Sequence, residues 1–295
     1  MGKKPTYGIC KLCGKRELLT YEHVPPRGAF NNHSIRQIRG DKLLEHIGSD
    51  AKPWDVSGLW GQIHQQGIGD YYLCKGCNEK TGSWYVPFYL DFVRGIYAAV
   101  ETADPTREAP YIGIKAPQIR PLPIFKEIMV MFCDINHNCF GDNNLRSYLL
   151  EKDSPISFDK KKYRVFSYIT KGDIFRMNGL SMLLLTSKNK EPLMIQISEI
   201  SYPPLGFALY IDLPNGYEPK GREITGLCDF KYEDIGEFET IFPVLENNIM
   251  FSGDYRTKDE IEKTIKESKA WEDKHKDLID RVNNRGENTC QIRNI

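Results

Sequence analysis

Four cysteines near the N-terminus have the spacing of a zinc site. They form two Cys-x-x-Cys pairs, Cys10 with Cys13 and Cys74 with Cys77. Zn²⁺ prefers tetrahedral coordination, and one such turn can point two thiolates at a single ion. Two pairs complete an all-thiolate shell with no open position, which predicts a structural ion. Redox use of the pairs is the alternative, but neither pair lies in a clear thioredoxin-like context.

Three further residues could perform hydrolytic chemistry. Glu22 and His23 are adjacent, and Asn78 directly follows the second cysteine pair. A carboxylate and a carboxamide oxygen suit a hard cation such as Mg²⁺. A neutral imidazole beside that cation can take a proton from an attacking water, while the cation stabilises charge on a phosphate. These are the parts needed to hydrolyse a phosphodiester. For a lone histidine beside an acid, a surface or core role is the alternative.

The order of these residues resembles the HNH, or ββα-metal (His-Me finger), endonucleases in their zinc-stapled form. The resemblance covers roughly residues 7–85 and is carried by Cys10-Lys11-Leu12-Cys13, Glu22-His23-Val24-Pro25-Pro26 and Cys74-Lys75-Gly76-Cys77-Asn78. It implies two strands and a helix around the site. It further implies that His23 is the general base and that Glu22 and Asn78 bind one Mg²⁺ or Mn²⁺. Products with 5′-phosphate ends are expected.

The chain departs from the family's pattern at two positions. Glu22 stands where an aspartate is common, which lengthens the ligand arm by one methylene group. The family's middle asparagine is expected shortly before Cys74, where this chain has Gly69 and Asp70, and Asp70 is the candidate substitute. A second hypothesis therefore stands beside the nuclease: a catalytically inactive zinc-stapled module that binds nucleic acid or protein.

The charge distribution favours a phosphate-binding surface near the N-terminus. The whole chain has net charge zero, but residues 1–40 hold eight basic and two acidic side chains, a net +6. Residues 231–295 hold 15 acids and 11 bases, a net −4. A local basic region of this kind fits nucleic-acid binding, with DNA preferred over RNA. The expected phosphate contacts are Arg27, Arg36, Arg39 and Lys80.

The pattern of elements predicts an α+β protein. We expect a strand that ends near His23, a second strand from Gly69 to Cys74 and a helix that begins near Asn78. These elements precede an apolar helix from Trp84 to about Val100. The expected organisation is a ββα-metal domain over 1–104, a Pro-rich linker over 105–123 and a mainly β domain over 124–295. The apolar run 125–133 fits either a helix or a strand. Thr257-Lys258-Asp259-Glu260 is a capping-box pattern that opens a final helix to about Val282.

The second domain carries no motif that we can assign. It could bind a protein partner or a second copy of the chain, and fold-level analogy suggests the sensor of a bacterial defence effector. No apolar run reaches the ~18–20 residues that a membrane span needs, and the N-terminus lacks the apolar region of a secretory signal. A cytoplasmic protein without a membrane partner is therefore expected. The other cysteines, at positions 133, 139, 228 and 290, are expected to be core thiols.

Overall fold

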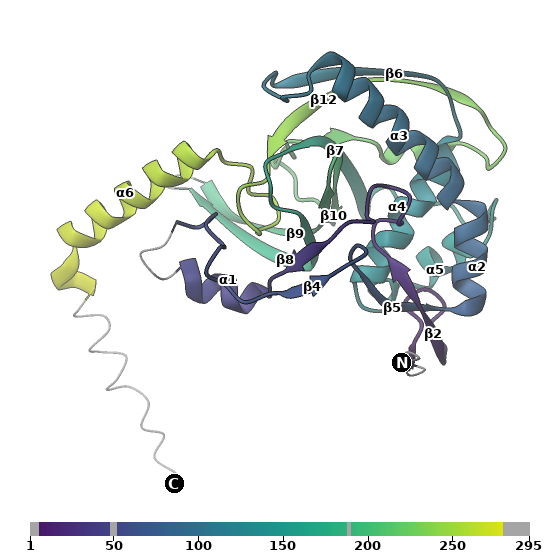
Figure 1. The fold of residues 1–295 in the computed structure, drawn as a ribbon, viewed down its shortest axis with the longest axis horizontal. Coiled ribbons are helices and arrows are strands. Elements are labelled where there is room, and N and C mark those ends of the chain that lie inside the picture. Colours follow the sequence, from purple (N-terminus) through teal and green to yellow (C-terminus); the bar gives the residue numbers. More distant parts are fainter. Residues whose placement is uncertain (1–5, 48–51, 188–189, 280–295) are drawn as a thin grey trace, which may run out of the picture. The chain divides into compact units, whose positions relative to one another are not determined.

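The computed structural model describes residues 6–47, 52–187 and 190–279, and it shows a mixed α+β protein (Figure 1). By its contacts the chain forms two compact units, Met1–Tyr255 and Arg256–Ile295. The first unit holds all the strands and the candidate site. Among the described residues, no helix combines the length and the apolar character that crossing a bilayer requires.

A three-stranded sheet and the helix that follows it position the N-terminal motifs. Strands β1 (Thr6–Ile9), β2 (Arg16–His23) and β5 (Gly69–Cys74) pair antiparallel in that order, and β5 leads directly into α2 (Lys75–Trp84). The turn between β1 and β2 contains Gly14 at φ +74°, a conformation that glycine adopts without steric cost. Pro25 and Pro26 follow the end of β2, since a proline has no N–H to donate to a ladder. The observed order is strand, strand, helix.

A long connection links β2 to β5. It contains strands β3 (Ile35–Gln37) and β4 (Gln62–His64), which pair with each other, and helix α1 (Gly40–Ile47). The connection returns to the sheet at Gly69, whose register partner on β2 is His23. Both ends of the connection therefore lie next to the candidate catalytic histidine.

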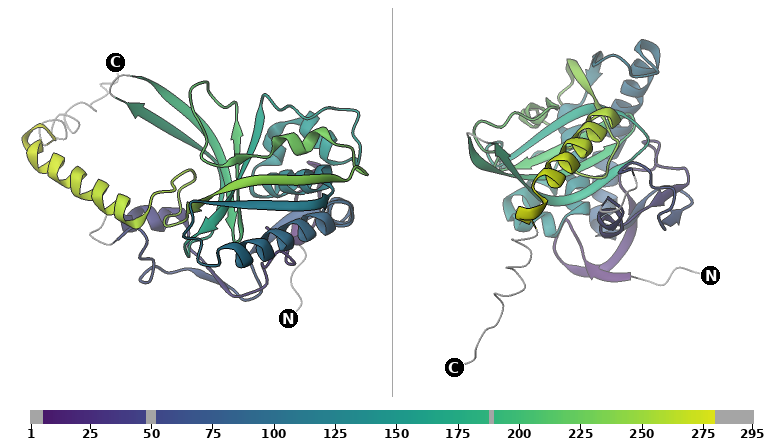
Figure 2. Two further views of the ribbon diagram at one scale, coloured as in Figure 1. Left: turned by 90° about the horizontal axis from the view of Figure 1, so that it is seen from above. Right: turned by 90° about the vertical axis from the view of Figure 1, so that its left-hand side faces the viewer.

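The larger sheet runs in the order β6-β12-β7-β10-β9-β8, with β11 (Arg222–Glu223) beside β7. Its strands are β6 (Tyr111–Ile119), β7 (Tyr163–Lys171), β8 (Arg176–Ser187), β9 (Lys190–Tyr202), β10 (Leu205–Ile211) and β12 (Gly236–Glu246). All neighbours are antiparallel except β12 and β7. The β8–β9 hairpin extends beyond the other strands (Figure 2).

Two apolar helices join the small sheet to the large one. Helix α3 (Val86–Ala103) packs against β6 and α4, while α4 (Pro121–Ile135) also contacts α2, β5, β8 and β9. The apolar run 125–133 is thus helical, and nearly every residue of α4 is buried. Helix α5 (Asn143–Leu149) packs on α4 as well.

A single hydrophobic core connects the N-terminal motifs to the large sheet. Cys10 and Leu12 belong to the same buried cluster as Phe125 of α4 and Phe207 of β10. Residues 105–123, which the sequence suggests are a linker, contain β6, and Ile112 and Ile114 of that strand are part of this core. The N-terminal sheet is therefore packed into the unit rather than attached to it by a flexible chain.

The second unit contains α6 (Lys258–Lys274). Thr257 caps this helix, and the reciprocal bonds with Glu260 form the capping box that the sequence predicts. The helix ends at Lys274, with His275 as its C-cap, rather than continuing unbroken toward Val282. Val282 itself lies outside the described residues.

Candidate functional site

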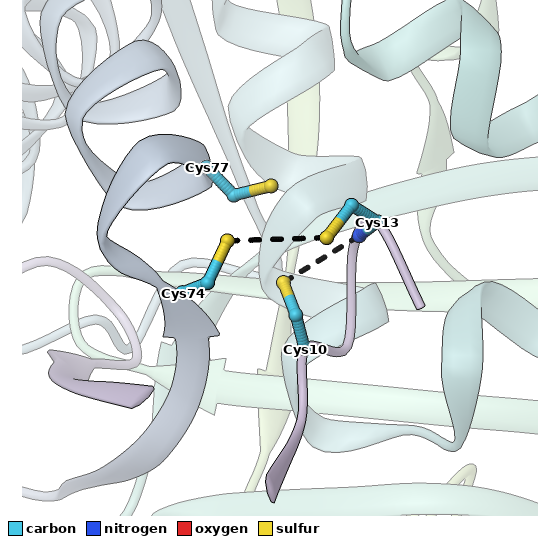
Figure 3. Close-up of side chains that lie close together, drawn as sticks. All are labelled: Cys10, Cys13, Cys74 and Cys77. Atoms are coloured by element: carbon cyan, nitrogen blue, oxygen red, sulfur yellow. Dashed lines mark hydrogen bonds between the residues drawn. The ribbon is translucent and has the colours of Figure 1, made fainter. Parts of the chain in front are cut away.

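The four cysteine sulfur atoms converge on one point between the β1–β2 turn and the start of α2 (Figure 3). The Sγ atoms lie within 4.8 Å of one another, and Cys13 Sγ is 3.9 Å from Cys74 Sγ. A tetrahedral Zn²⁺ with bonds of about 2.3 Å places its sulfurs about 3.8 Å apart. The group is therefore able to hold a metal ion, and its spacing is consistent with a structural zinc.

The electrostatics of the four thiols also favour a cation. A hydrogen bond from the Cys77 side chain lowers the pKa of Cys10, which favours a thiolate at that position. The same contact raises the pKa of Cys77, and burial raises the pKa of Cys74 to about 11. Without an ion, further thiolates would repel the first one. A divalent cation removes that penalty and lets all four sulfurs ionise.

Neighbouring elements hold the first cysteine turn in place. Lys11 N donates to Tyr72 O at 2.9 Å, which joins the turn to β5. Arg146 of α5 donates from Nε to Leu12 O at 2.9 Å. The turn is thus fixed from both the small sheet and the α-helical layer before any ion binds.

Glu22 and Asn78 meet on the face of β2 that packs against α2. Asn78 donates from Nδ2 to Thr20 Oγ1 at 2.9 Å, and Thr20 donates in turn to Leu73 O at 2.9 Å. Thr20 and Glu22 are two residues apart on β2 and share a face. Burial raises the pKa of Glu22 to about 7, against the lowering effect of hydrogen bonds from the His23 backbone and the Asn78 side chain. The structure therefore places Glu22, Asn78 and Thr20 in one group on this face of β2.

His23 points to the other face of β2. Its ring lies edge-on against Tyr21 at a centroid distance of 5.2 Å, and Nε2 is 3.1 Å from Gln66 O. A carbonyl oxygen can only accept, so Nε2 carries the hydrogen of this bond. In the neutral ring the basic nitrogen is then Nδ1. The structure therefore places the histidine at the same strand end as Glu22 but with its ring on the opposite side of the strand.

The other residues singled out from the sequence have the following positions. Asp70 is exposed, and its carboxylate accepts from the adjacent Tyr71 N at 2.8 Å. Arg36 donates to Val56 O at 2.8 Å, and Arg39 pairs with Asp41 at 3.0 Å, so both guanidinium groups bind within the long connection. Arg27 and Lys80 are exposed.

Two buried acids of α4 lie beneath Glu22, and sequence reasoning missed them. Glu127 and Asp134 are 4% and 2% exposed, and among the described residues Glu127 Oε2 and Asp134 Oδ1 have no hydrogen-bond partner. Burial raises the pKa of each well above its usual range, and the negative charge of Glu22 adds to both shifts. The sequence does mark these two acids: Glu127 interrupts the apolar run 125–133 and Asp134 directly follows it. A charged side chain is costly in such a buried run.

A cavity of about 700 Å³ lies beside the site. Its walls include Val24 and Pro25, which follow the candidate base, together with Ile38, Phe175 and Tyr202. Glu22, His23 and Asn78 do not line it. The candidate catalytic groups thus lie at the end of the small sheet and not in this apolar cavity.

The pH dependence of stability tests the burial of Glu127. Burial raises its pKa in the folded state, so between the unfolded and the folded pKa the folded protein holds a proton that the unfolded chain has released. The free energy of unfolding should therefore fall as pH rises above the ordinary glutamate pKa of about 4.3, by up to about 1.4 kcal/mol per pH unit for one proton. In Glu127→Gln this contribution is absent, and the profile should be flatter between pH 5 and 8.

Chemical denaturation at four pH values in that range measures this difference. Glu79→Gln, on the exposed side of α2, is the matched control and should retain the wild-type slope. Equal slopes in wild type and Glu127→Gln would show that Glu127 does not carry the proton.

Metal analysis tests the four-cysteine group. The purified protein should contain one zinc per chain, and Cys74→Ser should lower this content and the melting temperature together, because metal binding contributes to folding. Cys228→Ser, which changes a half-buried thiol outside the group, should keep its zinc. A folded wild-type protein that contains no metal would contradict the prediction.

Comparison of the chain with models of known protein families, with curated proteins and with solved structures found no match.

Proposed function

We propose that this protein is a metal-dependent endonuclease that hydrolyses phosphodiester bonds of DNA. The observation that carries the proposal is the contact of Glu22 with Asn78 at the start of α2, next to a histidine whose Nε2 is bound to a backbone carbonyl. With a metal ion bound, the four cysteines would hold the turn before β2 against the junction of β5 with α2. The resemblance to HNH endonucleases, which rests on the same residues, adds to this support.

In the proposed reaction His23 is the general base. Its Nδ1 accepts a proton from a water molecule, and the water oxygen attacks the phosphorus. The bond from phosphorus to the departing 3′ oxygen breaks, so one product carries a 5′-phosphate and the other a 3′-hydroxyl. The hydrogen bond to Gln66 O keeps Nε2 protonated, which leaves Nδ1 as the basic atom.

Glu22 and Asn78 are the residues that would hold Mg²⁺ or Mn²⁺. Because Asn78 Nδ2 donates to Thr20, the carboxamide oxygen Oδ1 is the atom able to ligate. Such an ion would stabilise negative charge on the phosphate and on the leaving oxygen. Arg27 and Lys80, both exposed, are the proposed phosphate contacts, since Arg36 and Arg39 bind within the long connection.

The second candidate is a catalytically inactive module that binds nucleic acid or protein. One observation favours it: the His23 ring and the Glu22 carboxylate lie on opposite faces of β2. A substrate must therefore reach around the end of this strand to contact both groups. In the inactive module, the zinc ion would stabilise the fold of a domain that binds nucleic acid or protein and does not cleave it.

Replacing the proposed base separates the two candidates. Wild-type protein with Mg²⁺ or Mn²⁺ should nick or cut DNA, and His23→Ala should lower the cleavage rate by about 10²–10⁴-fold, the usual contribution of a general base. Zinc content should be unchanged, because His23 is not part of the four-cysteine group. Cleavage is measured on supercoiled plasmid and zinc by elemental analysis.

His64→Ala is the matched control. His64 lies on β4 and bonds to Gln37 at 2.8 Å, away from Glu22 and Asn78, so this variant should cut like wild type. Undiminished cutting by His23→Ala would remove His23 as the base. DNA binding without cleavage under both divalent metals would favour the inactive module.

A further inference from the structure

Two buried cysteines outside the four-cysteine group lie with their sulfur atoms side by side. Cys133 is in the last turn of α4, Cys139 is in the short segment η1 (Asn138–Gly141), and each is 0% exposed. Both are free thiols, and their Sγ atoms are 2.6 Å apart. Only five residues separate the two cysteines, so a bond between the sulfurs would close a small loop at the end of α4.

The backbone around Cys139 has a conformation that needs support from its surroundings. Asn138, Cys139 and Phe140 have φ values of +49°, +46° and +57°, and Gly141 follows at +72°. In this left-handed region the Cβ atom of an ordinary residue crowds the following carbonyl oxygen. A run of three such residues therefore persists only where neighbouring groups hold it. The Cys139 thiol is inside this left-handed turn (residues 138–141), so a covalent bond to Cys133 would anchor the turn to α4.

The left-handed turn supports the first cysteine turn (residues 10–13). Arg146 donates from Nη2 to Asn138 Oδ1 at 2.7 Å and from Nε to Leu12 O at 2.9 Å, so one guanidinium group joins the two turns. The packing between them is close, because a Cβ atom at Gly14 would lie 3.1 Å from both Asn138 Oδ1 and Arg146 Nη2. Leu12 is inside the first cysteine turn, so the position of Asn138 bears directly on the first pair of metal-binding sulfurs.

We propose that Cys133 and Cys139 are an oxidation site, at which a reversible disulfide locks the left-handed turn and thereby the first cysteine turn. The bond tethers Cys139 to α4 and keeps Asn138 in contact with Arg146. In the reduced protein the left-handed turn can open, and the support of Leu12 O is then lost. The disulfide therefore makes the four-cysteine group retain its metal ion longer. This proposal does not depend on the nuclease function.

Hydrogen peroxide is an oxidant small enough to form this bond. His137 and Gly141 beside Cys139 are exposed, so opening the left-handed turn brings the Cys139 sulfur to solvent while α4 stays folded. The Cys139 thiolate attacks one peroxide oxygen, the O–O bond breaks, and a sulfenic acid and one water form. The Cys133 sulfur then attacks the sulfenic sulfur, the S–S bond forms and a second water leaves. The two thiols have lost two electrons and two protons, and the peroxide has been reduced to two waters.

Peptide mapping tests the bond itself. Full-length, zinc-loaded protein is treated with hydrogen peroxide, denatured, alkylated without a reductant and digested for mass spectrometry. Cys133 and Cys139 should escape alkylation, and both should become alkylated once a reductant is added. Cys228→Ala, which removes another thiol outside the four-cysteine group, should keep the bond. In Cys133→Ala, Cys139 should be recovered alkylated or with added oxygen. Alkylation of both cysteines in peroxide-treated wild type would overturn the proposal.

Zinc transfer to a chromogenic chelator tests the consequence for the metal site. The disulfide form should lose zinc about tenfold more slowly than the reduced form, the scale on which an outer-shell support acts on a metal site. Cys133→Ala should release zinc at the faster rate with or without peroxide, and Cys139→Ala replaces it if it does not fold. Equal rates for the two forms of wild type would overturn the link to the first cysteine turn. Faster release after peroxide in both wild type and Cys133→Ala would also overturn it, because the oxidant would then be acting on the four-cysteine group.

Discussion

The meeting of four sulfur atoms is the constraint on which the candidate site depends. Cys10 and Cys13 come from the turn after β1, whereas Cys74 and Cys77 come from the junction of β5 with α2. Holding these sulfurs together fixes β2, which begins just after the first pair, against the first turn of α2. The four-cysteine group therefore acts together with the β2–β5 pairing and the Asn78–Thr20 hydrogen bond to bring Glu22 close to Asn78.

The site is also built on the rest of the unit. Helix α4 packs against α2 and β5, and it carries the buried acids Glu127 and Asp134 close enough to Glu22 for their charges to interact. A buried carboxyl group is costly when ionised, so burial raises the pKa of each acid and favours its neutral form. Helix α4, which also contacts β8 and β9 of the larger sheet, therefore influences the electrostatics of the N-terminal motif.

Local patterns predicted the parts of the structure that depend on neighbouring residues. The cysteine turn with Gly14, the end of β2 before Pro25 and the capping of α6 by Thr257 all follow from short-range rules. The contact of Asn78 with β2 was also predictable, because the cysteine spacing brings the start of α2 to that strand.

Long-range partnerships could not be predicted in this way. Nothing near Asn31 in the sequence indicates that its partner is a backbone group 37 residues later. Glu127 and Asp134 are visible as acids in an apolar run, but the face of α4 that they occupy and the strand above it are set by tertiary packing. Glu22 and His23 point to opposite faces of β2 because side chains alternate along a strand. Which of the two faces α2 depends on the register of β2 with β5, which the sequence alone does not give.

The buried Asn31 side chain bonds to backbone atoms of Pro25 and Ile68, and these bonds have a consequence for how this protein can change. They close the chain between positions 32 and 67 into a loop whose two ends are joined. The entropy of closing a loop grows only with the logarithm of its length, so that doubling this one would cost about 0.6 kcal/mol. Insertions at exposed positions of this segment, away from the buried Ile35, Ile38 and Leu43, therefore cost little entropy while the two ends stay joined. The surface beside the histidine can thus change in length and sequence without a change in the strands that carry the histidine.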